Sequence, residues 1–112
     1  MNINVRTTIH DNRIPSIVAV FPGEVSAAVK KTAFDIEASA KTLAPVDTGA
    51  LRGSIAADAQ EFSATISPHT EYAVYVELGT YKMAAKPYMR PAADKNAPKF
   101  ARAITKIVKA MG

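Results

Sequence analysis

The sequence predicts a small α+β domain in which helices pack against one face of an antiparallel sheet. Residues 22–43 repeat apolar side chains every three to four positions, and residues 91–111 do so again. Residues 54–60 and 62–67 between them alternate apolar and polar side chains, which indicates a hairpin. A length of 112 residues without internal repeats or a linker fits one domain spanning 1–112.

The N-terminal stretch, residues 1–21, is expected to contribute a strand and a loop ahead of the main body, residues 22–112. Residues 2–9 alternate apolar and polar side chains, as in a half-buried strand that would join the hairpin. Asp11–Arg13 has the composition of a turn. Pro15 interrupts the apolar run that follows, so we expect a loop or a short irregular segment there.

The long helix is predicted over residues 22–43, with Pro22 in its first turn, where proline costs little. Pro45 disfavours helical geometry at Ala44, so the helix should end near Leu43. One face carries apolar residues at spacings of four and three: Val25, Val29, Ala33, Ile36, Ala40 and Leu43.

A short helix of one or two turns is expected after Asp47 and Thr48, which are good capping residues, with Gly53 as its C-terminal stop. Residues 71–78 fit a strand or a short helix. We favour the helix because Gly79 would lie just past its end.

The loop that follows, Thr80 to Arg90, has no period. It precedes the C-terminal helix predicted over 91–111. Pro98 lacks the N–H that a helix interior needs, so we expect a break near Asn96, with Asn96 capping the later part. The apolar face of that part comprises Phe100, Ile104, Ile107, Val108 and Met111.

The formal charge of +4 arises entirely after residue 92, because residues 1–92 carry equal numbers of acidic and basic side chains. The basic residues of the last helix would form a stripe roughly opposite its apolar face: Lys95, Lys99, Arg102, Lys106 and Lys109. Lys95 joins this stripe only if the helix is continuous. Such a stripe is either the solvated face of an amphipathic helix or a surface for DNA or an acidic partner.

The residues that could support catalysis are few. With no cysteine and only two histidines, His10 and His69, the chain offers no zinc ligand set. Its candidate carboxylates lie on different segments without motif spacing: Asp47, Asp58, Glu71 and Glu77. We expect no enzyme, no metal and no cofactor. Glu77 is expected to bond to Arg52 or Arg90.

No run of apolar residues is long enough to span a bilayer, and the N-terminus lacks the pattern of a signal peptide. We therefore expect no membrane partner and a protein used without secretion.

Tyrosines are concentrated in one part of the chain, and tyrosine is enriched at protein interfaces. Tyr72 and Tyr75 suit the core and an interface equally. Tyr81, Met83 and Tyr88 lie in the expected loop, where we favour an interface.

Three blocks in one order carry a family resemblance. They are Ala44–Ile55 (APVDTGALRGSI), Tyr72–Thr80 (YAVYVELGT) and Lys86–Ala92 (KPYMRPA). Together they resemble the tail-component or head–tail neck (tail completion) protein family of tailed bacteriophages of the siphophage type. The resemblance covers about residues 24–112 and leaves the first 20 residues outside.

The resemblance implies a structural, non-catalytic virion protein of a tailed phage or prophage, made in the bacterial cytoplasm. It implies self-assembly into a ring at the head–tail junction or proximal tail, docking to neighbouring connector or tail proteins, and non-specific contact of the basic stripe with packaged DNA. It implies neither a cofactor nor a small-molecule substrate.

The resemblance also assigns roles to the matched residues. A rigid turn would comprise Pro45, Asp47, Thr48, Gly49, Leu51, Arg52 and Ser54. An arm and subunit interface would comprise Tyr72, Tyr75, Glu77, Gly79, Thr80, Tyr81, Met83, Pro87, Tyr88, Arg90 and Pro91.

Two other functions stay open. A nucleic-acid-binding module using the basic C-terminal helix would bind DNA as a monomer in a salt-sensitive way. A small metal-dependent hydrolase would bring three carboxylates together around a divalent cation.

Overall fold

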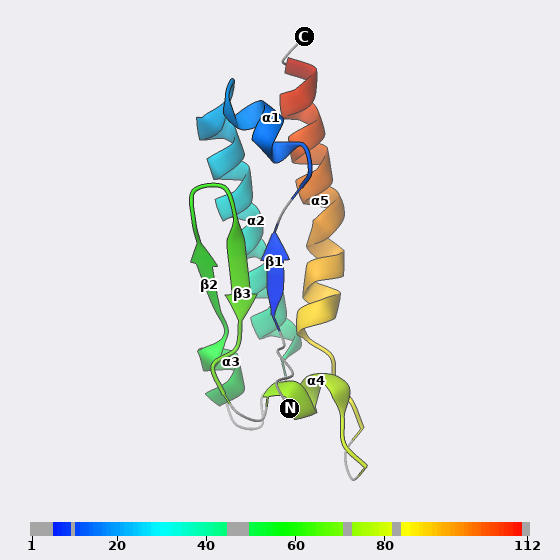
Figure 1. The fold of residues 1–112 in the computed structure, drawn as a ribbon. Helices are drawn as coiled ribbons and strands as arrows, with labels where there is room; N and C mark the ends of the chain where they lie inside the picture. The colour runs from blue at the N-terminus through cyan, green and yellow to red at the C-terminus, as the bar shows by residue number, and fades with distance from the viewer. Residues whose placement is uncertain (1–5, 10, 45–49, 71–72, 82–83, 111–112) are drawn as a thin grey trace.

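The computed structural model confirms the α+β class (Figure 1). It describes residues 6–9, 11–44, 50–70, 73–81 and 84–110. Its elements are, in chain order, β1 (Thr7–Ile9), α1 (Ile14–Val18), α2 (Pro22–Leu43), α3 (Ala50–Ser54), β2 (Ala56–Ala59), β3 (Ala64–Ser67), α4 (Ala73–Leu78) and α5 (Met89–Ala110). The molecule is elongated, with principal extents of 55, 25 and 20 Å.

The sheet has the order β1-β3-β2, and both pairings are antiparallel. Ile66 of β3 lies opposite Thr7 on one side and Ala57 on the other. Ala64 and Ile66 are buried while Thr65 between them faces the other way, as the alternation predicts. The hairpin is therefore confirmed, with strands shorter than the predicted 54–60 and 62–67. The N-terminal strand is confirmed over Thr7–Ile9, and residues 2–5 of its predicted range lie outside the described residues.

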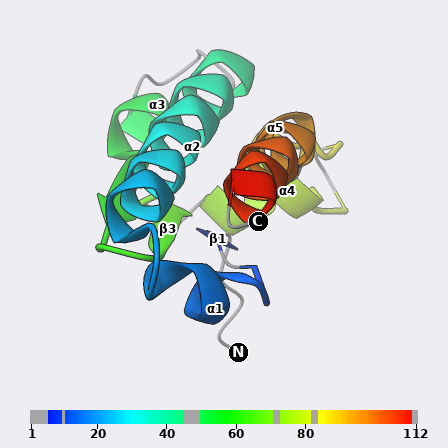
Figure 2. The same ribbon diagram turned by 90° about the horizontal axis from the view of Figure 1, so that it is seen from above.

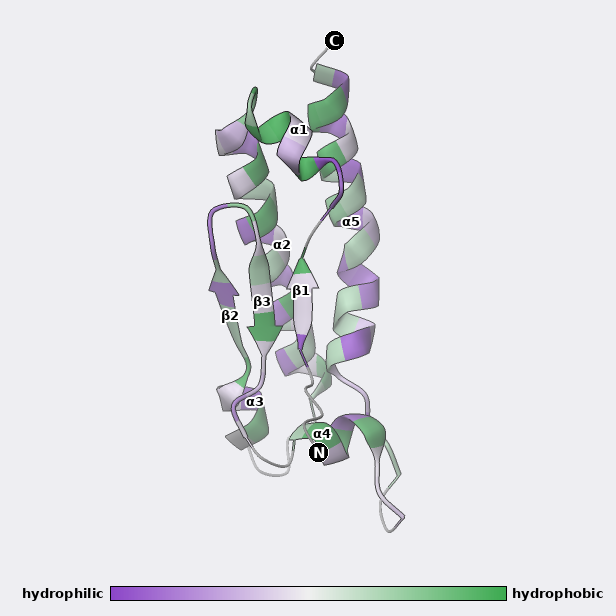
Figure 3. Cartoon of the chain, viewed as in Figure 1, coloured by the Kyte–Doolittle hydropathy of each residue, from purple (hydrophilic) through white to green (hydrophobic). Residues whose placement is uncertain are grey.

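Helices α2 and α5 lie side by side and cover one face of the sheet (Figures 1 and 2). The predicted apolar face of α2 is buried except for Leu43, which is exposed at the end of the helix. From α5, Phe100 and Ile104 enter the same core. Figure 3 shows hydrophilic and hydrophobic bands along α5, as expected of a helix with one buried face.

The predicted break in the last helix is wrong, because α5 runs without interruption through Pro98. Pro98 lies on the exposed side, and the carbonyl that loses its usual helical donor belongs to the exposed residue Asp94. Water can hydrogen-bond to that carbonyl, so the proline costs less here than it would in a buried turn.

Asn96 is consequently no cap. It is buried inside α5, where its Nδ2 donates to the carbonyl of Ala92 at 2.8 Å and to Oγ of Ser39 at 3.1 Å. The second bond joins α5 to α2. Asn96 thus belongs to the helix–helix contact, and its preference for helix starts is overridden by that packing.

The segment expected to be irregular contains the short helix α1. Pro15 lies in the first turn of α1. An N–H group there has no acceptor within the helix, so the proline removes no helical hydrogen bond. Ile14 and Ile17 of the same helix are buried. The turn before it is confirmed, since the N–H of Ile14 donates to the carbonyl of Asp11 at 3.0 Å.

The favoured helix within 71–78 is confirmed as α4, over Ala73–Leu78. Gly79 follows with φ of 80°, a left-handed conformation that suits glycine, and its N–H donates to the carbonyl of Tyr75 at 2.8 Å. Gly53, in contrast, lies inside α3 without a positive φ, so it is not the predicted stop. That helix ends at Ser54, whose Oγ donates to the carbonyl of Leu51 at 2.8 Å.

Candidate assembly surface around α4

Glu77 of α4 holds the start of α5. Its Oε1 accepts hydrogen bonds from the backbone N–H groups of Tyr88 at 3.1 Å and Met89 at 2.9 Å, and its Oε2 accepts one from Arg90 at 3.3 Å. The first N–H groups of a helix have no partner within it and carry a partial positive charge. The Glu77 side chain, 8% exposed, therefore acts as an N-terminal cap supplied by a neighbouring helix.

The expected bond between Glu77 and Arg90 is thus present, but through the backbone N–H of Arg90. The other expected partner, Arg52, uses its guanidinium to donate to the carbonyl of Ala44 at 3.3 Å. Glu77 forms no ion pair with a described residue. The sequence predicted the importance of Glu77 but not the kind of group that it binds.

The loop between α4 and α5 is anchored at its C-terminal end as well. The N–H of Lys86 donates to the carbonyl of Val76 at 2.8 Å, and the hydroxyl of Tyr88 donates to the carbonyl of Ala73 at 3.3 Å. With Glu77 and Gly79, these bonds fix both ends of the loop to α4. Figure 1 shows the described parts of this loop, residues 80–81 and 84–88, beyond α4 at one end of the molecule.

Tyr88 corrects one interface prediction, because it is 0% exposed and belongs to the core. Burial raises the pKa of its hydroxyl, and the negative charge of Glu77 raises it further. Met89 is buried beside it. The sequence of the loop has no hydrophobic period, so it gave no sign that the side chain of Tyr88 is buried.

Three large apolar side chains, here called the α4 patch, remain exposed around this loop: Tyr75 at 54%, Leu78 at 60% and Tyr81 at 93%. Tyr75 and Leu78 lie three residues apart and so share one side of α4. Sequence reasoning missed Leu78, although its spacing of three residues from both tyrosines was a usable signal. Exposed aromatic and aliphatic side chains in close sequence are typical of a contact surface.

The other predicted interface residues differ in how exposed they are. Thr80, Pro87 and Arg90 are exposed, and Gly79 and Pro91 are half-buried. Tyr72 and Met83 lie outside the described residues.

The predicted rigid turn is described only in its second half. Pro45, Asp47, Thr48 and Gly49 lie outside the described residues, whereas Leu51 is buried and Arg52 and Ser54 are half-buried. Its role stays a prediction.

The basic residues of α5 form one stripe. All are exposed, and the continuity of the helix brings the first of them into line with the rest: Lys95, Lys99, Arg102, Lys106 and Lys109. At 3.6 residues per turn they fall within an arc of about 80° over about 21 Å. None forms an ion pair with a described residue.

Among the described residues, no three or more histidine, aspartate or glutamate side chains gather in a way that could hold a metal ion. Asp58 is exposed on β2 and Glu77 is engaged with α5, while Asp47 and Glu71 lie outside the described ranges. In the same part of the chain, no helix combines the length and apolarity needed to cross a membrane.

Comparison with known proteins finds no match among curated sequences. No solved structure matches either. One family matches over residues 11–79, more than half of the chain, and its description is "Bacteriophage HK97-gp10, putative tail-component".

The matched range starts earlier than the resemblance predicted from residue 24, so it takes in α1, and it stops before the third block at Lys86–Ala92. It contains the block at 44–55 and all but the last residue of the block at 72–80. The protein therefore belongs to the HK97-gp10-like family of bacteriophage tail components.

Proposed function

We propose that this protein is a non-catalytic structural subunit of the head–tail connector or tail-completion ring of a tailed phage or prophage. In this role it assembles with copies of itself and docks to neighbouring connector or tail proteins. The observation that carries the proposal is the α4 patch, which combines exposed apolar side chains with a firmly anchored backbone.

The anchoring matters for the energy of association. A flexible loop loses conformational freedom when it binds, and that loss opposes assembly. Here Glu77, Gly79 and the Lys86–Val76 bond fix the two ends of the loop in advance. A pre-organised contact surface of this kind supports a role in repeated subunit contacts.

The family and the order of the three sequence blocks support the proposed placement at the head–tail junction or proximal tail, after synthesis in the bacterial cytoplasm. The surface described above favours contact with other proteins over the binding of a small molecule or a metal. Assembly contacts need exposed apolar area, whereas hydrolysis would need convergent carboxylates.

Non-specific contact with packaged DNA is a second element of the proposal, carried by the basic stripe. A ring would repeat this stripe in every subunit and so form a band of positive charge. A cationic band attracts phosphates through counterion release, which makes the contact strongly dependent on salt. The same stripe supports the alternative function, a nucleic-acid-binding module that acts as a free monomer.

Light scattering across a range of concentrations tests the proposal, at low and moderate salt. The full chain should form a discrete species of several subunits, and replacing Tyr75 and Leu78 together by serine should shift it toward the monomer. Val20→Ser is the matched control, because Val20 is also exposed but lies just after α1, which ends at Val18. A strict monomer that binds DNA tightly would favour the nucleic-acid module instead.

A further inference from the structure

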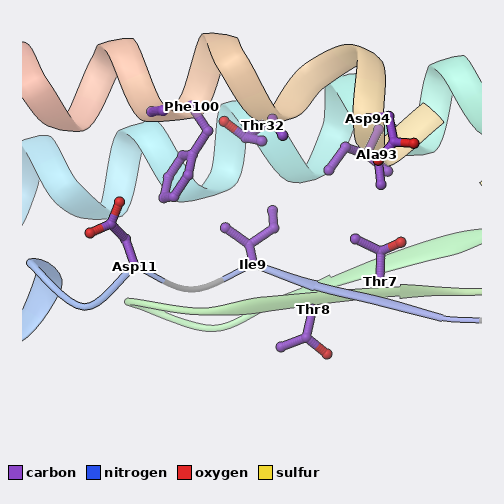
Figure 4. Close-up of a pocket in the computed structure, with 11 residues that line it drawn as sticks. Thr7, Thr8, Ile9, Asp11, Thr32, Ala93, Asp94 and Phe100 are labelled. Carbon is purple, nitrogen blue, oxygen red and sulfur yellow. The ribbon is translucent and has the colours of Figure 1, made fainter. Parts of the chain in front are cut away.

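A groove of about 330 Å³ opens between β1 and α5. In Figure 4 the side chains of Thr7 and Ile9 point from β1 toward the helices, while Thr8 points away. Ile36 and Thr32 of α2 and Phe100 of α5 also line the groove. In the described part of the chain β1 is an edge strand of the sheet, and the groove lies on its side next to α5.

The lining has a definite chemical character. Ile9, Ile36 and Phe100 supply apolar surface, and hydroxyl groups of threonines stand beside them. Among the described residues that line it, the charged ones are two acids, Asp11 and Asp94. An occupant should therefore be an amphipathic side chain carried on a basic segment.

We propose that the groove receives the Thr80–Pro87 loop of a second copy, with the Tyr81 ring seated between β1 and α5. This inference depends on the self-assembly proposed above and specifies its contact. Tyr81 is 93% exposed in its own chain, which makes it the most exposed large hydrophobic residue described. An aromatic ring with a polar tip fits a cavity lined by isoleucine, phenylalanine and threonine.

Charge supports the same occupant. The loop carries Lys82 and Lys86 and no acidic residue. In the groove, Asp11 is already paired with Arg13 at 2.8 Å, whereas Asp94 is exposed and forms no ion pair with a described residue. Asp94 is therefore the carboxylate available to a lysine of the incoming loop.

Geometry favours a second copy over the same chain. The described ends of the loop lie beyond α4 at one end of the molecule (Figure 1). The groove is lined by residues of β1, α2 and α5 and by none of the described residues of the loop. A contact between two different surfaces of the same protein is heterologous, and it generates a closed ring when the rotation between copies closes. The proposed contact thus provides the type of interface that a ring requires.

Charge reversal tests the pairing. Asp94→Lys and Lys86→Glu should each weaken association by about tenfold or more, because each places like charges together, and the double variant should recover most of the loss. Lys30→Glu is the control, since Lys30 is exposed on α2 away from the groove. Association in both single variants equal to that of the control would overturn the inference.

Three further variants address the Tyr81 side chain and the groove. Tyr81→Ser should abolish the assembled species while Tyr81→Phe should retain it, and Ala97→Trp should block the groove from the α5 side. Circular dichroism establishes that each variant is folded. If Tyr81→Ser dissociates the assembly but folded Ala97→Trp does not, the loop docks elsewhere and the inference is wrong.

Crosslinking gives a readout that does not depend on loss of assembly. It can be directed to single chosen positions, because the natural chain has no cysteine. Ala84→Cys protein mixed with Ala97→Cys protein should yield a mixed dimer with a short bis-maleimide. Ala56→Cys, on the exposed face of β2, should not. Crosslinking to position 56 in preference to 97 would overturn the docking site, and a wild-type chain that never associates would contradict the proposed function itself.

Discussion

The carboxylate of Glu77 lies 2.9 Å from the backbone nitrogen of Met89, so a side chain of α4 caps the first turn of α5. The two residues are 12 positions apart in the chain. The bond closes the loop that carries Tyr81 and fixes it relative to the longest helix pair of the fold. If the loop makes the proposed subunit contact, assembly and stability depend on the same residue, Glu77.

Replacing Glu77 should destabilise the protein. Glu77→Ala leaves three backbone N–H groups without their acceptor and should lower the free energy of unfolding by about 2–3 kcal/mol. Glu77→Gln keeps one acceptor oxygen and should cost about 1 kcal/mol. Urea denaturation measures both, with Glu61→Ala, at an exposed site in the hairpin turn, as control. A Glu77→Ala variant as stable as the control would refute the capping role.

Removing the proline inside α5 should stabilise the protein. Pro98→Ala restores an N–H that can donate to the carbonyl of Asp94 and improves helix propensity. The alanine chain is also freer when unfolded, which offsets part of the gain. We expect a net gain of about 1–2 kcal/mol in urea denaturation. A loss of stability would mean that the helix needs the proline.

Asn96 should contribute to the contact between α2 and α5. Asn96→Ala removes bonds to Ala92 and Ser39 and should cost about 1–2 kcal/mol. Ser39→Ala should lower the free energy of unfolding by less, because it removes only one of these two hydrogen bonds. In a double-mutant cycle the losses should not add, since both changes delete the same bond. Full additivity would show that the two side chains act independently.

Tyr88 should make the protein sensitive to alkali. Burial and the charge of Glu77 raise the pKa of its hydroxyl above the ordinary value of about 10, so the folded state keeps a proton that the unfolded chain releases. The stabilisation is complete below about pH 10 and is lost as the pH rises toward the folded-state pKa, by about 1.4 kcal/mol per pH unit. Unfolding of Tyr88→Phe should show a shallower pH dependence above about pH 10. Equal slopes for the two proteins would contradict this assignment.

The sequence was sufficient to predict those elements whose structure depends on residues close to one another along the chain. The apolar period of α2, the alternation in β3 and the position of Gly79 after α4 are local signals, and each led to a correct prediction. The break at Pro98 was wrong because tertiary packing of Phe100 and Ile104 maintains the helix on both sides of the proline.

The candidate site was predicted less completely. Glu77 was identified, but its partners are backbone N–H groups, which leave no mark in a sequence. Tyr88 turned inward because its hydroxyl finds the carbonyl of Ala73 across the loop, a contact between residues 15 positions apart. Leu78 was missed because an apolar residue in a short helix is usually part of a core.

The mass of the purified full chain across concentration tests the central claim, that this tail component assembles through its anchored loop. Light scattering on the wild type and on Tyr81→Ser, at matched concentrations and salt, is the decisive comparison. The account predicts a discrete species of several subunits for the wild type and a folded monomer for Tyr81→Ser. A wild-type monomer at every concentration, or an assembly that Tyr81→Ser leaves intact, would contradict it.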